Sequence, residues 1–259
     1  MRLFRTVAFL ICVLMLASST RAQTLRVAAA ADLQFAMSDL ASQYEKKTGT
    51  KPEISYGSSG NFRAQIANGA PFDVFFSADA MYPEQLVTAG VADASSLVVY
   101  GQGHLVLWAP GGANLQLAQR GFAALKDARV MKIAIANPEH APYGRAAVAA
   151  LQKAGLYEEV KPKLVLGENI SQAAQFAQSG NAQVGILALS LTFAESMKSG
   201  ERWEIPAEYY PAILQKAVIV SASKNKSAAK AFLDFVKSDE GRRILAKYGL
   251  APPESSNQP

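Results

Sequence analysis

The feature that most constrains the fold of this chain is an alternation of short apolar runs with segments of helical spacing. Residues 73–78 and 132–136 are apolar nearly throughout, which is typical of strands buried on both faces. The segment from Leu33 to Tyr44 has its apolar residues at helical spacing, and Gly49 follows its expected end. Strands and helices in this order predict a parallel sheet with helices on both faces.

The alternation occurs in two stretches of the chain, which predicts an α/β fold of two lobes, each a mostly parallel sheet flanked by helices. We expect residues 23–103 together with 217–259 to form the first lobe and residues 104–216 to form the second. The length of 259 residues, half of them apolar, suits cores of this size.

The first 22 residues read as a secretory signal peptide and do not belong to the predicted fold. Arg2 and Arg5 precede an apolar run at residues 7–17, and small residues then lead to Ala22, after which we expect cleavage. The run is too short to span a membrane comfortably, and no other segment approaches that length. The pattern therefore predicts a soluble protein exported to a bacterial periplasm.

Cysteine usage and charge argue against several classes of function. The single cysteine, Cys12, lies in the predicted signal peptide and follows Ile11, whereas a lipoprotein cysteine follows a small residue. The mature chain is thus expected to have neither disulfides nor thiolate metal sites, and His104 and His140 have no second ligand at metal spacing. Removing the three arginines of the signal peptide leaves 23 basic residues against 21 acidic ones, so the high pI indicates no nucleic-acid partner.

A loop of small residues between a short strand and a short helix is the first candidate for a binding site. In Gly57-Ser58-Ser59-Gly60, two hydroxyl groups and several unhindered backbone N–H groups lie where a helix is expected to begin. A helix N-terminus of this kind readily binds an anion. Taken alone, the loop is better explained as a tight turn or a flexible linker than as a binding site.

Four junctions between an apolar strand and a helix share this character. In open α/β sheets, ligands bind outside the carboxyl ends of the strands, where these junctions are expected. Each junction offers backbone N–H groups, and none presents a lysine or arginine directly. Neutral donors at helix ends suit a small, fully ionised oxyanion. The junctions are Ala31-Asp32, Ser58-Ser59, Pro142-Tyr143-Gly144 and Asn169-Ile170.

Five motifs, spread over nearly all of the mature chain, point to one family. They are Ala28-Ala29-Ala30-Ala31-Asp32-Leu33, Tyr56-Gly57-Ser58-Ser59-Gly60, the long run at residues 65–79, the loop at residues 137–144 and the closing Lys247-Tyr248-Gly249. With these motifs the chain resembles the molybdate-binding, ModA-type solute-binding proteins of ABC importers. The resemblance implies a type II periplasmic-binding-protein fold whose two lobes close on molybdate or tungstate in the cleft between them. It also implies a monomer that is no enzyme, needs no cofactor and delivers the oxyanion to a membrane permease and its ATPase.

The resemblance also implies which residues bind the oxyanion. The family's donors fall on Asp32, Ser59, Tyr143 and Ile170. At Tyr143 and Ile170 the expected donor is the backbone N–H, whereas Ser59 is expected to use its hydroxyl and its N–H. The metal enters as the oxyanion, so no side chain is expected to ligate it directly. Further candidates for ligand binding are Ala31, Ser58 and Asn61.

Two positions depart from the family pattern. Where many members have Ser or Thr, this chain has Asp32, whose carboxylate would repel a dianion. We expect the Asp32 side chain to turn away and cap the helix that starts at Leu33, so that only its N–H binds. Some members place a tyrosine hydroxyl where Ala188 stands, so that donor is absent here and Asn61 is a candidate to replace it.

Two alternative functions stay open at this point. The same fold could bind another tetrahedral oxyanion such as sulfate, which is smaller than molybdate. Ser58 or Ser59 could instead be the nucleophile of a secreted hydrolase. The sequence contains no Gly-x-Ser-x-Gly elbow and no evident base, so catalysis is not expected.

Overall fold

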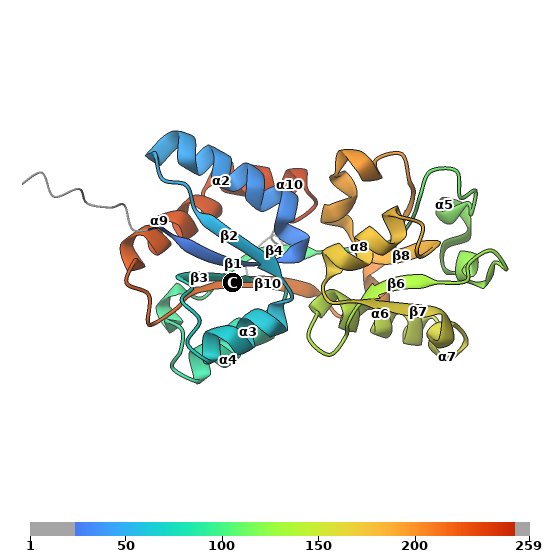
Figure 1. The fold of residues 1–259 in the computed structure, drawn as a ribbon, viewed down its shortest axis with the longest axis horizontal. Coiled ribbons are helices and arrows are strands. Elements are labelled where there is room, and N and C mark those ends of the chain that lie inside the picture. The colour runs from blue at the N-terminus through green and yellow to red at the C-terminus, as the bar shows by residue number, and fades with distance from the viewer. Residues whose placement is uncertain (1–23, 252–259) are drawn as a thin grey trace, which may run out of the picture.

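The computed structural model describes residues 24–251, which form two lobes that lie side by side (Figure 1). The predicted signal peptide with Cys12 and the residues from 252 onward lie outside the described residues. The strands are β1 (Arg26–Ala30), β2 (Glu53–Gly57), β3 (Val74–Ser77), β4 (Val98–Gly103), β5 (Leu105–Ala109), β6 (Ile133–Ala136), β7 (Leu164–Gly167), β8 (Val184–Ala188), β9 (Glu201–Glu204) and β10 (Ile213–Ile219). They form one sheet of order β2-β1-β3-β10-β4 and a second of order β7-β6-β8-β5-β9. The two-lobed α/β fold predicted from the sequence is confirmed.

Each sheet combines parallel and antiparallel pairs. β1 is parallel to β2 and β3, and β6 is parallel to β7 and β8. β10 is antiparallel to β3 and β4, and β5 is antiparallel to β8 and β9. The alternation in the sequence does not anticipate these antiparallel pairs, because they involve strands that pass between the lobes and belong to no strand–helix–strand unit.

Helices cover both faces of each sheet (Figure 1). On the first sheet, α2 (Gln34–Thr48), α9 (Lys226–Lys237) and α10 (Asp239–Lys247) lie on one face, and α3 (Ser59–Ala67) and α4 (Met81–Thr88) lie on the other. On the second sheet, α8 (Ile170–Gln178) lies opposite α6 (Pro142–Lys153), and the short helices are α5 (Leu117–Arg120) and α7 (Tyr157–Val160). The 3₁₀ helices are η1 (Ala31–Leu33), η2 (Ala94–Ser96), η3 (Gly121–Lys126), η4 (Lys161–Lys163), η5 (Leu189–Phe193), η6 (Glu195–Met197) and η7 (Ala207–Tyr209).

Helix α2 shows how the apolar spacing positions one edge of the cleft. Met37, Leu40 and Tyr44 are buried in the core of the first lobe. Gly49 ends the helix with φ 71°, a conformation that glycine adopts without strain, and its N–H donates to Glu45 O at 2.8 Å. The start of the helical segment is fixed by η1, which directly follows the carboxyl end of β1 and carries Asp32.

Two connections join the lobes. β4 ends at Gly103 and β5 begins at Leu105, so a single residue separates strands of different sheets. The chain returns from β9 through η7 to β10, which belongs to the first sheet from Ile213 onward, whereas the predicted boundary is residue 217. The hinge between the lobes therefore consists of short connections that enter strands on both sides.

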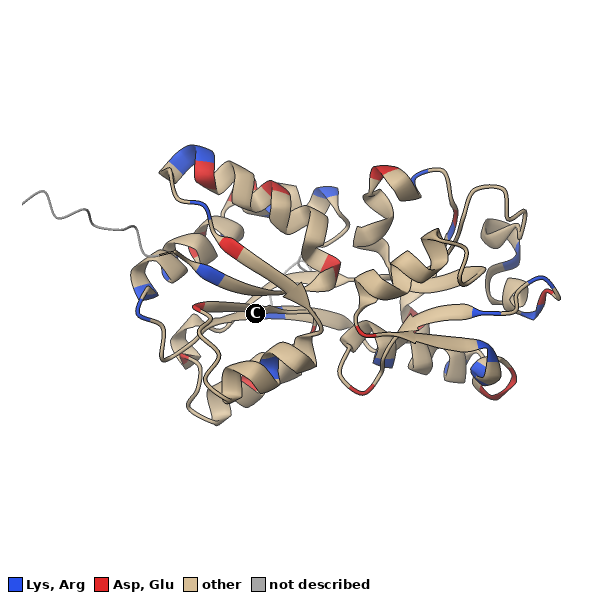
Figure 2. Ribbon diagram, in the orientation of Figure 1, with Lys and Arg blue, Asp and Glu red and all other residues tan. Residues whose placement is uncertain are grey.

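Charged residues are spread over both lobes without a block of a single sign (Figure 2). This distribution agrees with the near balance of acidic and basic residues in the predicted mature chain. Among the helices of residues 24–251, none is both long enough and apolar enough to cross a membrane.

Candidate anion-binding site

A small cavity lies between the lobes where four helical segments begin. Its volume is about 10 Å³, roughly the smallest that accommodates one water-sized sphere. Its walls come from η1 and from the N-terminal ends of α3, α6 and α8, so the structure brings together all four junctions singled out in the sequence. The lining residues are Ala31, Asp32, Gly57, Ser58, Ser59, Ala78, Ala141, Pro142, Tyr143, Asn169 and Ile170.

Hydrogen bonds between the lobes show that this is a closed arrangement. The His140 carbonyl oxygen of the second lobe accepts from Ser58 Oγ at 2.6 Å and from the Gly60 N–H at 2.9 Å. Near α2, Ser171 Oγ donates to the Ala31 carbonyl oxygen at 3.0 Å. Arg145 on α6 donates to Asp79 Oδ2 and to Tyr82 Oη of the first lobe. The cavity is therefore bounded by contacts that exist only when the lobes are together.

The hydroxyl hydrogen of Ser59 has no acceptor among the described residues. It is the first residue of α3 and is 1% exposed, and its Oγ accepts from the Ala78 N–H at 3.0 Å. A hydroxyl has one hydrogen to donate, and no acceptor for it is found among the described residues. Ser58 differs, because its hydrogen is directed to the His140 carbonyl oxygen. Of the two hydroxyls in the loop, that of Ser59 is thus the one able to donate into the cavity.

Tyr143 and Ile170 contribute backbone N–H groups from the second lobe. Tyr143 follows Pro142 in the first turn of α6, and Ile170 is the first residue of α8. N–H groups in the first turn of a helix have no partner within the helix, and they point toward the positive end of its dipole. The Asn169 side chain caps α8 by accepting from the Gln172 N–H at 3.1 Å, which fixes this end of the helix at the cavity.

The Asp32 carboxylate does not cap the following helix, which corrects the prediction. No side-chain cap is present at the start of η1 or of α2. Instead, Asp32 Oδ2 accepts from Gln215 Nε2 at 2.6 Å and from Tyr143 Oη at 3.0 Å, and Asp32 Oδ1 has no hydrogen-bond partner among the described residues. The hydroxyl and the amide are themselves buried and need an acceptor, so they hold the carboxylate in the interior.

Burial raises the pKa of Asp32 to about 6, although the hydrogen bonds from Gln215 and Tyr143 act in the opposite direction. Burial likewise raises the pKa of the Tyr143 hydroxyl well above its ordinary value, and the Asp32 charge adds to this effect. Tyr143 donates and Asp32 accepts across the lobes, and no basic side chain within residues 24–251 forms an ion pair with Asp32. The result is a buried, uncompensated carboxyl group in the wall of the cavity.

Gln215 and Gly103 complete this network from the hinge strands, and the sequence analysis did not identify either residue. Gln215 Nε2 also donates to Tyr143 Oη at 3.1 Å, and the residue is fully buried on β10 at a register shift. A Cβ at position 103 would lie 2.2 Å from Tyr143 Oη, so glycine is required there for the hydroxyl to fit. The signal in the sequence that could have pointed to Gln215 was its amide side chain within the largely apolar strand β10.

The predicted roles of Asn61 and Ala188 look different in the structure. Asn61 does not line the cavity, and its Nδ2 donates to Glu168 Oε1 of the second lobe at 2.6 Å. Ala188, at the end of β8, is also absent from the lining. Nearby, Ser190 Oγ donates to the Asp32 carbonyl oxygen at 2.8 Å. In this closed structure the Asn61 amide therefore joins the lobes and is not directed into the cavity.

A base does lie beside Ser58, contrary to the expectation from the sequence. His140 Nδ1 is 2.8 Å from Ser58 Oγ. The other ring nitrogen, Nε2, is 3.7 Å from Glu168 Oε1, which is too long for a hydrogen bond. Ser58 is 4% exposed, and its hydrogen is directed to a carbonyl oxygen. The pair is better explained as a contact between the lobes than as a nucleophile with its base.

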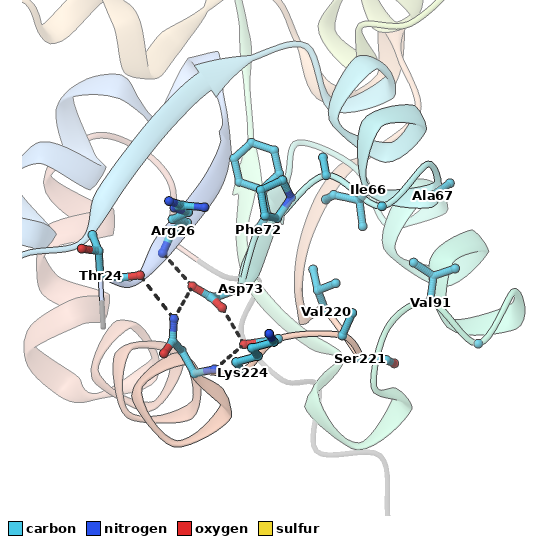
Figure 3. A pocket seen from close by; sticks show the side chains of 17 residues that line it. Thr24, Arg26, Ile66, Ala67, Phe72, Asp73, Val91, Val220, Ser221 and Lys224 are labelled. Atoms are coloured by element: carbon cyan, nitrogen blue, oxygen red, sulfur yellow. Dashed lines mark hydrogen bonds between the residues drawn. The ribbon is translucent and has the colours of Figure 1, made fainter. Parts of the chain in front are cut away.

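A larger cavity, of about 620 Å³, lies at the other end of the first lobe (Figure 3). It adjoins Arg26 at the amino end of β1, whereas ligands of such sheets bind at the carboxyl ends. Its buried acid, Asp73, already accepts from Arg26 N, Ser223 Oγ and Asn225 Nδ2. None of the predicted site residues lines it. Within residues 24–251, no group of three His, Cys, Asp or Glu side chains could hold a metal ion.

The fold and the cavity define a two-lobed binding protein. The chain belongs to the family of bacterial extracellular solute-binding proteins, which it matches over residues 25–251. It is 42% identical to the molybdate-binding protein ModA of Azotobacter vinelandii over 91% of this chain and 92% of that protein. It is 40% identical to ModA of Rhodobacter capsulatus over 86% of each. The solved periplasmic molybdate-binding protein of A. vinelandii matches with a TM-score of 0.84 and 36% identity over 89% of this chain and 100% of that chain. The family resemblance inferred from the motifs is confirmed.

Proposed function

We propose that this protein binds molybdate, and tungstate with it, in the periplasm and delivers the oxyanion to an ABC permease and its ATPase. The observation that carries the proposal is the closed cavity into which four helical segments direct their N-termini and Ser59 its free hydroxyl hydrogen. The similarity to molybdate-binding relatives supports the identity of the ion. The predicted signal peptide supports the location.

Binding is proposed to proceed by closure of the lobes around the anion. The first lobe supplies Ser59 and the Asp32 N–H, and the second supplies the N–H groups of Tyr143 and Ile170. The lining contains no lysine or arginine, so the negative charge is stabilised by hydrogen bonds and by the positive ends of helices. Because donors from both lobes meet only in the closed form, the anion stabilises that form.

The closed form is also proposed to be the form that the permease accepts. Contacts across the cleft, such as Ser58 with His140 and Asn61 with Glu168, fix the relative position of the lobes. A permease that contacts both lobes can therefore distinguish the loaded protein from the free one. We propose that the protein works as a monomer and has no catalytic activity of its own.

A thermal-shift panel of oxyanions tests the proposal. Molybdate and tungstate are expected to raise the melting temperature, since a ligand at 100 times its Kd adds about 2.7 kcal/mol to the free energy of unfolding. In competition calorimetry, a hundredfold excess of sulfate is expected to displace little molybdate, because a closed cage discriminates by the size of the anion. Equal affinity for sulfate would instead identify a protein for another tetrahedral oxyanion.

A further inference from the structure

Asp32 presents a problem that the proposed function alone does not solve. Its side chain is 1% exposed and lines the same cavity as the donors of the anion site. Its hydrogen bonds come from an amide and a phenol, which are both neutral. Two unit charges about 4 Å apart repel each other by about 4 kcal/mol at an effective dielectric constant of 20. An ionised Asp32 and a bound dianion in a closed site that excludes water would therefore repel each other by several kcal/mol.

This repulsion could in principle be relieved in three ways, and the structure argues against two of them. The first is a neighbouring cation, but no ion pair to Asp32 is found within residues 24–251, and Arg145, two residues after Tyr143 on α6, is engaged by Asp79. The second is rotation of the carboxylate into solvent, which the closed lobes and the bonds to Gln215 and Tyr143 oppose. The third is a proton on the carboxyl group itself.

We propose that capture of the oxyanion is coupled to the uptake of one proton, which Asp32 holds against the bound anion. This inference rests on the proposed function, because it concerns the same cavity. The proton comes from the solvent, and no covalent bond of the anion changes. Asp32 thereby determines the pH range over which the protein binds the anion and the charge of the anion that it binds.

The geometry of the carboxyl group assigns a place to the proton. Oδ2 already accepts from Gln215 and Tyr143, and both of these bonds persist when the acid is neutral. Oδ1 is buried without a partner, which is costly for an acceptor of either charge state. A proton on Oδ1 makes it a donor, and an anion oxygen in the cavity is the acceptor that such a donor requires.

The surrounding groups favour the neutral acid. The titratable side chains that interact with Asp32 are Tyr143 on α6 and Tyr100 on β4, and both have a pKa raised well above the ordinary value, so both stay neutral. On β10 the facing group is the Gln215 amide. The pKa of Asp32 is about 6 without the anion, and a dianion in the cavity raises it further. Because the acid form favours the loaded state, affinity falls as the pH rises above 6.

Calorimetry with molybdate in two buffers of different ionisation enthalpy measures the proton count directly. At pH 7 the wild-type protein is expected to take up close to one proton per anion, and its affinity is expected to fall by up to about tenfold per pH unit above that. Asp32→Asn keeps the size and the acceptor oxygen but has no proton to gain. Its proton uptake is expected to vanish and its affinity to become independent of pH. Glu53→Gln, which changes an exposed carboxylate at the amino end of β2 and away from the cavity, should leave the proton count unchanged.

The outcomes separate this inference from the proposed function. Molybdate binding with the same proton count in wild type and Asp32→Asn would overturn the proton coupling and leave the function intact. If Asp32→Asn does not fold, a wild-type proton count of zero overturns the coupling by itself. No binding of molybdate by the wild type would overturn both. Inorganic phosphate is the last probe. An ionised Asp32 would prefer an anion such as phosphate, whose own proton can be donated to the carboxylate. Phosphate binding tighter than molybdate would therefore indicate an ionised Asp32 and would also overturn the inference.

Discussion

Replacing Ser59 by alanine is expected to weaken molybdate binding by about 10- to 150-fold. A hydrogen bond to a charged group contributes about 1.5–3 kcal/mol, and Ser59 provides the hydroxyl of the cavity whose hydrogen is free. The change also removes the acceptor of the buried Ala78 N–H, so we expect a loss of about 1–2 kcal/mol in the free energy of unfolding. Calorimetry gives the affinity, and denaturant unfolding of the free protein gives the stability.

Two neighbouring serines serve as controls for this change. Ser58→Ala removes a contact between the lobes but no free donor, so its effect on affinity should be clearly smaller than that of Ser59→Ala. Ser55→Ala alters an exposed position on β2 and should have no effect. Equal losses for Ser58→Ala and Ser59→Ala would mean that the hydroxyl of Ser59 has no special role in the site.

Replacing Gly60 by alanine is expected to hold the lobes apart. A Cβ at this position would lie 2.7 Å from the His140 carbonyl oxygen and 2.8 Å from His140 Cβ, both in the other lobe, and 2.7 Å from Tyr82 Oη of the first lobe. Gly60 lies in the first turn of α3, where alanine is the better helix former by about 0.5–1 kcal/mol. The gain in helix propensity and the need for Tyr82 Oη to shift oppose each other, so the free protein should stay close to wild type in stability, whereas molybdate affinity should fall at least tenfold. Small-angle scattering should show that molybdate no longer compacts the molecule.

The opposite pattern is expected for Gly180→Ala. Gly180 follows α8 with φ 75°, so a side chain strains the backbone there, and no atom lies within 4 Å of the added Cβ. Stability should fall and affinity should stay unchanged. If Gly60→Ala bound molybdate as tightly as wild type and still became compact, closure through this contact would have no part in binding.

The elements that the sequence predicts well are those set by local pattern. The apolar runs of β1, β3 and β6, and the helix starts that follow them, carry their own signal in spacing, glycine and N-terminal residues. The four junctions follow β1, β2, β6 and β7, two strands in each sheet, and because ligands of such sheets bind at the carboxyl ends of the strands, the junctions could be assigned to one site before any contact was known. β9 carried no such signal, because it is an edge strand of sequence Glu-Arg-Trp-Glu.

The parts that the sequence does not predict depend on contacts across the lobes. The direction of the Asp32 side chain is decided by Tyr143 and Gln215, which lie 111 and 183 residues away in the chain. A local reading assigns an aspartate near a helix start to a cap, and here two buried donors compete successfully for it. The partner of Ser58, His140, is likewise 82 residues away. The hydrogen-bond partners of these side chains depend on which groups become buried together when the lobes close.

Anomalous diffraction at the molybdenum edge from crystals grown with molybdate tests the central assignment most directly. We expect one peak between the lobes, with its oxygens in hydrogen-bond contact with Ser59 Oγ and the N–H groups of Tyr143 and Ile170. A peak in the larger cavity beside Arg26 and Lys224, or no peak at all, would contradict the assignment.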